Sequence, residues 1–147
     1  MNSLWHEQTR KNAITRLERL TPDSKPLWGR MNAAQMVAHL SDALRMASGE
    51  ISTTPKKLAI RYPPLKQLIV YWLPFPKNAP TATELIGRIP GPWEHETGAL
   101  VHQVEHFGRR NTGNNWPVHP AFGKLSTNAW GVLAYRHIDH HFRQFGI

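Results

Sequence analysis

The chain has 147 residues, 40% of them hydrophobic, which suits one domain over residues 1–147 with its own core and excludes a disordered segment. It contains no cysteine, so disulfides and thiolate metal sites are excluded, and an ion could be held only by His, Asp, Glu or Gln. The net charge of +8 raises the question of whether the chain binds nucleic acid. The cations are scattered, however, with one loose group at Lys56, Lys57, Arg61 and Lys66. We therefore expect no nucleic-acid partner.

The sequence also gives no sign of a membrane segment. The longest apolar run, residues 68–73, is far too short to span a bilayer. The first residues lack the basic start and apolar core of a secretory signal. We expect a cytoplasmic protein with no membrane partner.

Apolar residues at helical spacing predict two amphipathic helices in the first third of the chain. The first covers residues 4–20 and ends at a Thr-Pro-Asp-Ser turn. The second begins after Asn32, a good N-cap residue, and runs to Ala47, where Ser-Gly stops it. Because a short loop joins them, we expect antiparallel neighbours.

Prolines then dominate, since eight of the 12 lie between Pro55 and Pro92. This pattern predicts a long crossover over residues 52–92, interrupted by one short helix at residues 65–72. A connection of this length is usually functional, and we expect it to form the wall or lid of a pocket.

Two more helices complete the prediction. One follows Pro92 and continues to about Arg110, and the long crossover lets it run parallel to the second helix. The last covers residues 130–144, after capping residues at 126–128. The sequence thus predicts an all-α fold, a four-helix bundle with one long Pro-rich crossover between helices 2 and 3.

Four of the histidines form two His-x-x-x-His pairs, and the two pairs differ in the direction that they face. His102 and His106 lie opposite the apolar stripe of their helix and should face solvent. His137 and His141 lie within the stripe of the last helix and should face the core. Buried imidazoles need partners, and their nitrogens are good ligands for zinc, nickel, copper and iron. The inward pair is therefore either a hydrogen-bonded core pair or part of a metal site.

A metal site needs a third ligand. His39, at the border of the second helix's apolar stripe, is the best candidate, although its position also suits a half-exposed polar residue. His119, before the last helix, is the next. Three histidines would leave positions open for water or substrate, as catalytic sites do. The residues that could orient these ligands or line the pocket, or else be ordinary polar flanks of helices, are Gln35, Asp42, His119, Trp130, His140 and Gln144.

Three segments resemble the DinB/YfiT-like superfamily, and more narrowly one bacterial subfamily of it: N-A-A-Q-M-V-A-H-L-S-D in the second helix, H-P-A-F-G-K-L before the last, and W-G-V-L-A-Y-R-H-I-D-H-H-F-R-Q-F-G at the end. The resemblance covers essentially the whole chain. It implies a four-helix bundle with a divalent metal, nickel, zinc or iron, on His39, His137 and His141. It also implies a low-molecular-weight thiol, since relatives include bacillithiol and mycothiol transferases and a thiol-dependent isomerase.

Two functional hypotheses follow. The first is a metal-dependent enzyme whose ion activates a thiol or water for transfer to, or hydrolysis of, a small electrophilic substrate. The alternative is a non-catalytic bundle that binds a small molecule or a partner. We also expect a homodimer, because four tryptophans are not all easily placed inside one core: Trp5, Trp72, Trp93 and Trp116.

Overall fold

The computed structural model of the chain describes residues 1–77, 85, 88–110, 113 and 115–147. Within these ranges the fold is all-helical, with five α-helices and no strand. The helices are α1 (Glu7–Leu17), α2 (Ala33–Ala47), α3 (Leu65–Tyr71), α4 (Trp93–Arg109) and α5 (Thr127–Gln144), with a 3-10 turn, η1, at Ala59–Arg61. The predicted all-α class is confirmed.

The helix starts follow from local chemistry. Asn32 and Gln35 form a reciprocal capping box at α2, in which each side chain accepts a hydrogen bond from the other residue's backbone N–H. The Ser126 side chain caps α5 by accepting from the Ala129 amide, so α5 begins three residues earlier than predicted. The predicted starts and ends of α3 and α4 agree with the structure to within one residue.

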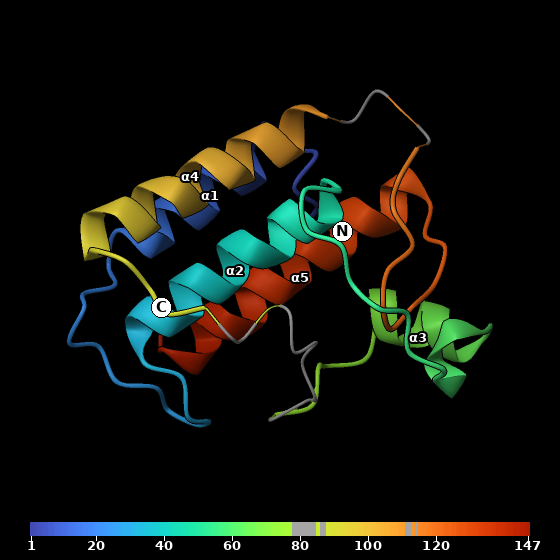
Figure 1. Ribbon diagram of the computed structural model, residues 1–147, viewed down its shortest axis with the longest axis horizontal. Coiled ribbons are helices and arrows are strands. Elements are labelled where there is room, and N and C mark those ends of the chain that lie inside the picture. The colour runs from blue at the N-terminus through green and yellow to red at the C-terminus, as the bar shows by residue number, and fades with distance from the viewer. Residues whose placement is uncertain (78–84, 86–87, 111–112, 114) are drawn as a thin grey trace.

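The four longer helices lie lengthwise against one another (Figure 1). α2 contacts α4 and α5, and α1 contacts the same two helices. In Figure 1, α2 and α4 run in one direction and α1 and α5 in the other, so the predicted parallel run of α2 and the helix after the crossover is confirmed.

The expectation that α1 and α2 are neighbours is wrong, although they are antiparallel. α2 is buried on nearly every side, and it therefore takes α4 and α5 as its close partners. α1 buries only a narrow face and packs across α4 and α5 instead. Residues 18–32 are long enough to carry the chain from one position to the other.

The first residues form a buried segment rather than the start of α1, which corrects the predicted start at residue 4. Leu4 is fully buried, and its amide donates to the Gly131 carbonyl at 3.1 Å. The Trp5 ring stacks on Phe107 at 4.8 Å, and its Nε1 donates to the Thr127 carbonyl at 2.9 Å. Residues 3–6 form a turn, closed by the His6 amide donating to the Ser3 carbonyl at 3.1 Å, and a helix from residue 4 would not allow these contacts.

α3 belongs to a separate group of contacts, which we call the α3 lobe and define as residues 55–77 and 119–125. The lobe is held to α5 by Arg136, whose guanidinium donates to the carbonyls of Ile69, Val70 and Leu73. Val70 is buried among Phe122, Ala129 and Leu133. In Figure 1, α3 stands at one end of the molecule, apart from the longer helices. Among the described residues, no helix combines the length and apolar character needed to cross a membrane.

Candidate metal centre

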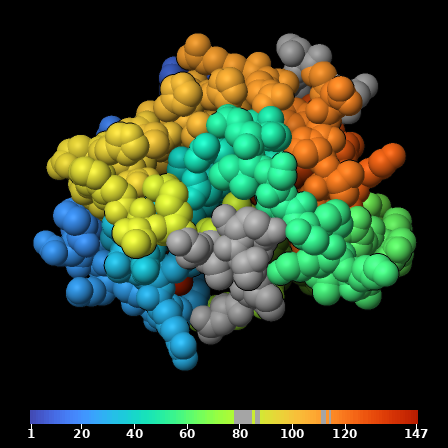
Figure 2. Space-filling view, viewed as in Figure 1, coloured from blue at the N-terminus to red at the C-terminus, as the bar shows by residue number. Residues whose placement is uncertain are grey.

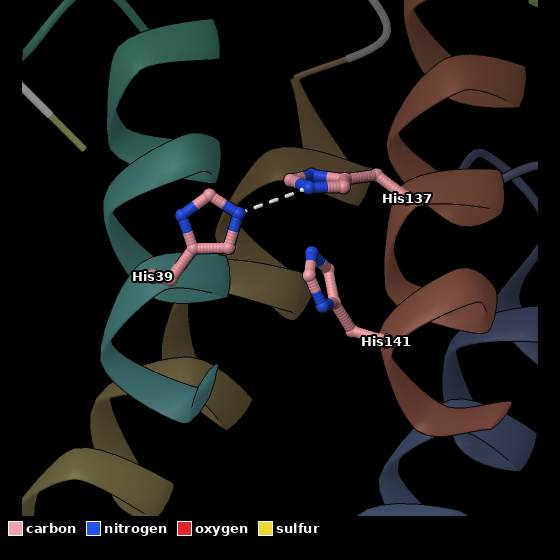
Figure 3. Close-up of side chains that lie close together, drawn as sticks. All are labelled: His39, His137 and His141. Carbon is pink, nitrogen blue, oxygen red and sulfur yellow. Dashed lines mark hydrogen bonds between the residues drawn. The ribbon is translucent and has the colours of Figure 1, made fainter. Parts of the chain in front are cut away.

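Three histidines from α2 and α5 converge in the interior (Figure 3). His39, from α2, faces His137 and His141, which lie one turn apart on α5. Each ring offers one nitrogen, and these three atoms lie within 4.8 Å of one another. His39 and His141 are buried and His137 is half-buried. His39 is not at an exposed border, because its ring packs against those of His137 and His141 and its Nδ1 lies against the Leu85 carbonyl.

The tautomer of His39 is fixed by its surroundings. Its Nδ1 lies 3.1 Å from the carbonyl oxygen of Leu85, which can only accept a hydrogen bond. Nδ1 therefore carries the proton of the neutral ring. The Nε2 lone pair is left free on the side that faces the two α5 histidines.

The tautomer of His141 is fixed in the same way through Gln144. The Gln144 amide nitrogen donates to the Trp28 carbonyl at 2.8 Å, so its oxygen must point the other way. That oxygen lies 2.8 Å from His141 Nδ1 and accepts its proton. Gln144 thus turns the His141 Nε2 lone pair toward His39 and His137, in the pattern by which metal-binding histidines are held.

The spacing of the nitrogens also suits an ion. His39 Nε2 and His137 Nε2 are 3.1 Å apart. Two ligands with bonds of about 2.1 Å to one ion are separated by about 3.0–3.4 Å. Without an ion, His137 must donate to His39, whose Nε2 has only a lone pair to offer. The same two atoms could instead share a cation.

All three rings are neutral near pH 7. Burial lowers the pKa of His39, and it lowers the pKa of His137 well below the usual value. Burial, followed by the nearby His39, lowers the pKa of His141 from 6.5 to about 3. A neutral imidazole is the form that binds metal, so protons compete with an ion here only in acid.

These shifts predict that the metal-free chain loses stability in acid. Each ring has a folded pKa below its unfolded value, so its contribution is intact above pH 6.5 and is lost as the pH falls toward the folded pKa. The lowered pKa of His141 alone should reduce the free energy of unfolding by about 2 kcal/mol at about pH 5. Urea unfolding across this range, with a chelator present, measures the effect. His141→Gln should flatten the dependence, and an unchanged slope in that variant would contradict the prediction.

The other predicted histidines surround this group without joining it. His119 Nδ1 accepts from the amides of Ala121 and Phe122, both at 3.1 Å, so its Nε2 carries the proton and cannot act as a neutral ligand. The His119 ring packs 5.3 Å from that of Trp130, which is buried. His140 packs edge-on against the ring of Trp28 at 6.0 Å. Among these side chains, His140 contacts the group, since its ring lies 5.2 Å from that of His141.

Gln35 and Asp42 lie on the same flank of α2 as His39 but do not hydrogen-bond to its ring. The Gln35 side chain serves the capping box. The Asp42 carboxylate binds Arg88 Nε at 2.9 Å and Arg45 Nη1 at 3.3 Å. The partner of His39 is instead a backbone carbonyl of the crossover, which side-chain patterns in the sequence do not reveal.

A cavity of about 200 Å³ adjoins His39 on this flank, and Gln35 and Asp42 line it. The described residues that line it are Arg30, Met31, Gln35, Ala38, His39, Asp42, Leu85 and Arg88. Arg88 also binds both oxygens of the buried Glu96, at 2.6 and 2.9 Å, and holds the pKa of that carboxyl near 2. This ion pair is not predictable from the sequence, because Glu96 in the first turn of a helix resembles an ordinary charge near the N-terminus.

A comparison of the chain with protein-family models, curated proteins and solved structures found no match. The geometry of the three histidines therefore carries the functional interpretation.

Proposed function

We propose that the chain is a metal-dependent enzyme, built on a four-helix bundle of the DinB-like type, in which His39, His137 and His141 hold one divalent ion. In this proposal α1, α2, α4 and α5 form the bundle, and α3 belongs to the crossover. The observation that carries it is the convergence of three neutral rings, each with one nitrogen within 4.8 Å of the other two, and two of the rings are held by hydrogen bonds at Nδ1. An all-imidazole set suits zinc, nickel or iron.

Such an ion would lower the pKa of a bound thiol or water, so that it can attack a small electrophile at neutral pH. Three protein ligands leave coordination positions for that group. The chain's own residues supply orientation: the Leu85 carbonyl fixes His39, and Gln144 fixes His141. Either transfer of the thiol or hydrolysis of the substrate fits this chemistry.

Gln144→Leu tests the orienting role. The variant keeps a side chain of similar size but leaves His141 Nδ1 without its acceptor, so we expect metal affinity to fall about 10–100-fold. Competition with a chromogenic chelator measures the affinity. Gln103→Leu is the matched control, because Gln103 is also a buried glutamine but lies on α4. Equal affinities of the two variants would remove Gln144 from the proposed site.

The enzymatic proposal is tested with the full chain in metal-free and metal-loaded forms. We expect about one divalent ion per chain, and loss of free thiol when L-cysteine or bacillithiol is mixed with an aryl halide only in the loaded form. If chain prepared from nickel-, zinc- and iron-supplemented cultures retains no ion, the proposal is wrong.

A non-catalytic binding function is the second candidate, and the cavity beside His39 favours it. That cavity contacts His39 but neither α5 histidine, so a small molecule could occupy it without reaching the three Nε2 atoms. Thermal shift separates the two functions. An enzyme should respond to metal and to thiols or electrophiles in combination, whereas a pure binder should be indifferent to the thiols and electrophiles.

A further inference from the structure

The α3 lobe carries charge of only one sign. Residues 55–77 and 119–125 contain six cationic residues and no acidic one. Arg61 donates to the carbonyls of Lys56 and Pro120, and Lys66 donates to that of Lys124. These carbonyl partners are uncharged, so they position the cations without neutralising them. The lobe is therefore a positively charged end of the molecule.

The same lobe exposes apolar side chains on an ordered surface. Ten large apolar side chains are exposed among the described residues, and six of them belong to the lobe: Leu58, Tyr62, Leu65, Leu68, Trp72 and Leu73. Trp72 is 72% exposed and Tyr62 is 68% exposed. Figure 2 shows residues 55–77 of the lobe, in green, at the surface of the molecule.

The exposed apolar residues form a helical stripe. Leu65, Leu68 and Trp72, three and then four residues apart, share one face of α3 and its C-cap. Val70, on another face, is buried against α5. Packing within the chain is thus complete on one side of α3, while a second apolar face remains toward solvent.

We propose that the α3 lobe docks onto the surface of an anionic phospholipid membrane. An apolar stripe that includes a Trp, on a lobe that also carries an exposed Tyr and several lysines, is the arrangement that inserts shallowly among lipid headgroups while its cations meet anionic lipids. This departs from the expectation that the chain has no membrane partner, which rested on the absence of a spanning segment.

The charge of the lobe argues for lipid over other occupants. Two copies joined lobe to lobe would bring two sets of exposed cations together, Lys57 and Lys124 among them, and their repulsion would oppose the contact. A nucleic acid could pair its phosphates with the cations, but it would leave the leucine stripe exposed to water. An anionic lipid surface can both pair with the cations and bury the leucine stripe.

Co-sedimentation of the full chain with vesicles tests this proposal. We expect binding to vesicles of phosphatidylcholine and phosphatidylglycerol in equal parts, and much less to phosphatidylcholine alone. The double variant Leu68→Gln/Trp72→Gln should lower partitioning about ten-fold or more, since it removes the apolar insertion. Lys57→Gln and Lys124→Gln, which change exposed lysines of the lobe, should each lower it roughly five-fold.

Matched controls use exposed residues outside the lobe. Leu27 and Ile89 are 70% and 90% exposed, and Leu27→Gln/Ile89→Gln should leave partitioning unchanged. Lys25→Gln is the control for charge. Absence of binding to the mixed vesicles would overturn the proposal, as would equal partitioning of the two double variants. Dimerisation that Leu68→Gln/Trp72→Gln abolishes, without vesicle binding, would assign the surface to a second copy.

Discussion

His137→Ala is expected to abolish stoichiometric metal binding, with a loss in affinity of more than about 100-fold. Removing an orienting partner alone costs about 10–100-fold, and removal of a ligand costs more. His39 Nε2 would lose the atom now 3.1 Å away, and two nitrogens would remain where a protein site needs three. Elemental analysis of purified chain, followed by titration of the metal-free chain, measures the change.

The matched control is His102→Ala/His106→Ala on α4. These rings are exposed, as predicted, and lie 5.9 Å apart, so the pair resembles His137 and His141 in spacing but has no third histidine near it among the described residues. This variant should keep its tightly bound ion and lose only weak surface binding. If the ion instead follows the α4 pair, the interior site is not the metal centre.

Gly131→Ala is expected to destabilise the chain by about 2–3 kcal/mol, even though Ala normally favours a helix. A Cβ on Gly131 would lie 2.2 Å from Trp5 Nε1 and 2.4 Å from Ser3 Oγ. Trp5 cannot move aside cheaply, because its ring stacks on Phe107 and its Nε1 donates to the Thr127 carbonyl. The variant must displace the buried N-terminal segment, which urea unfolding and Trp fluorescence would both report.

Gly98→Ala supplies the opposite result as a control. Gly98 lies within α4, and a Cβ there would meet nothing within 4 Å. We expect this variant to gain about 0.5–1 kcal/mol, because only helix propensity changes. A Gly131→Ala variant as stable as Gly98→Ala would show that the N-terminal segment does not occupy the position described.

The helices could be predicted because their signals are local. Apolar spacing indicated α2, α4 and α5, the prolines at 64 and 74 bounded α3, and the cap residues Asn32 and Ser126 marked two of the starts. The direction of a side chain on a helix follows from its position in the sequence, which is why the outward facing of His102 and His106 was predictable. α1 was extended too far because Leu4 is apolar in any conformation, and its spacing could not show that it enters the core from outside a helix.

The sequence by itself determined the positions of α2 to α5 and the facing of the His102/His106 and His137/His141 pairs, since these depend on local signals and on the 3.6-residue period of one helix. Only the tertiary structure decided that α1 lies against α4 and α5, and that His39 meets His137 and His141. It also decided the tautomers, through the carbonyls of Leu85 and Trp28. Every residue has a backbone carbonyl, so only the path of the chain in space determines which one reaches a given ring or amide.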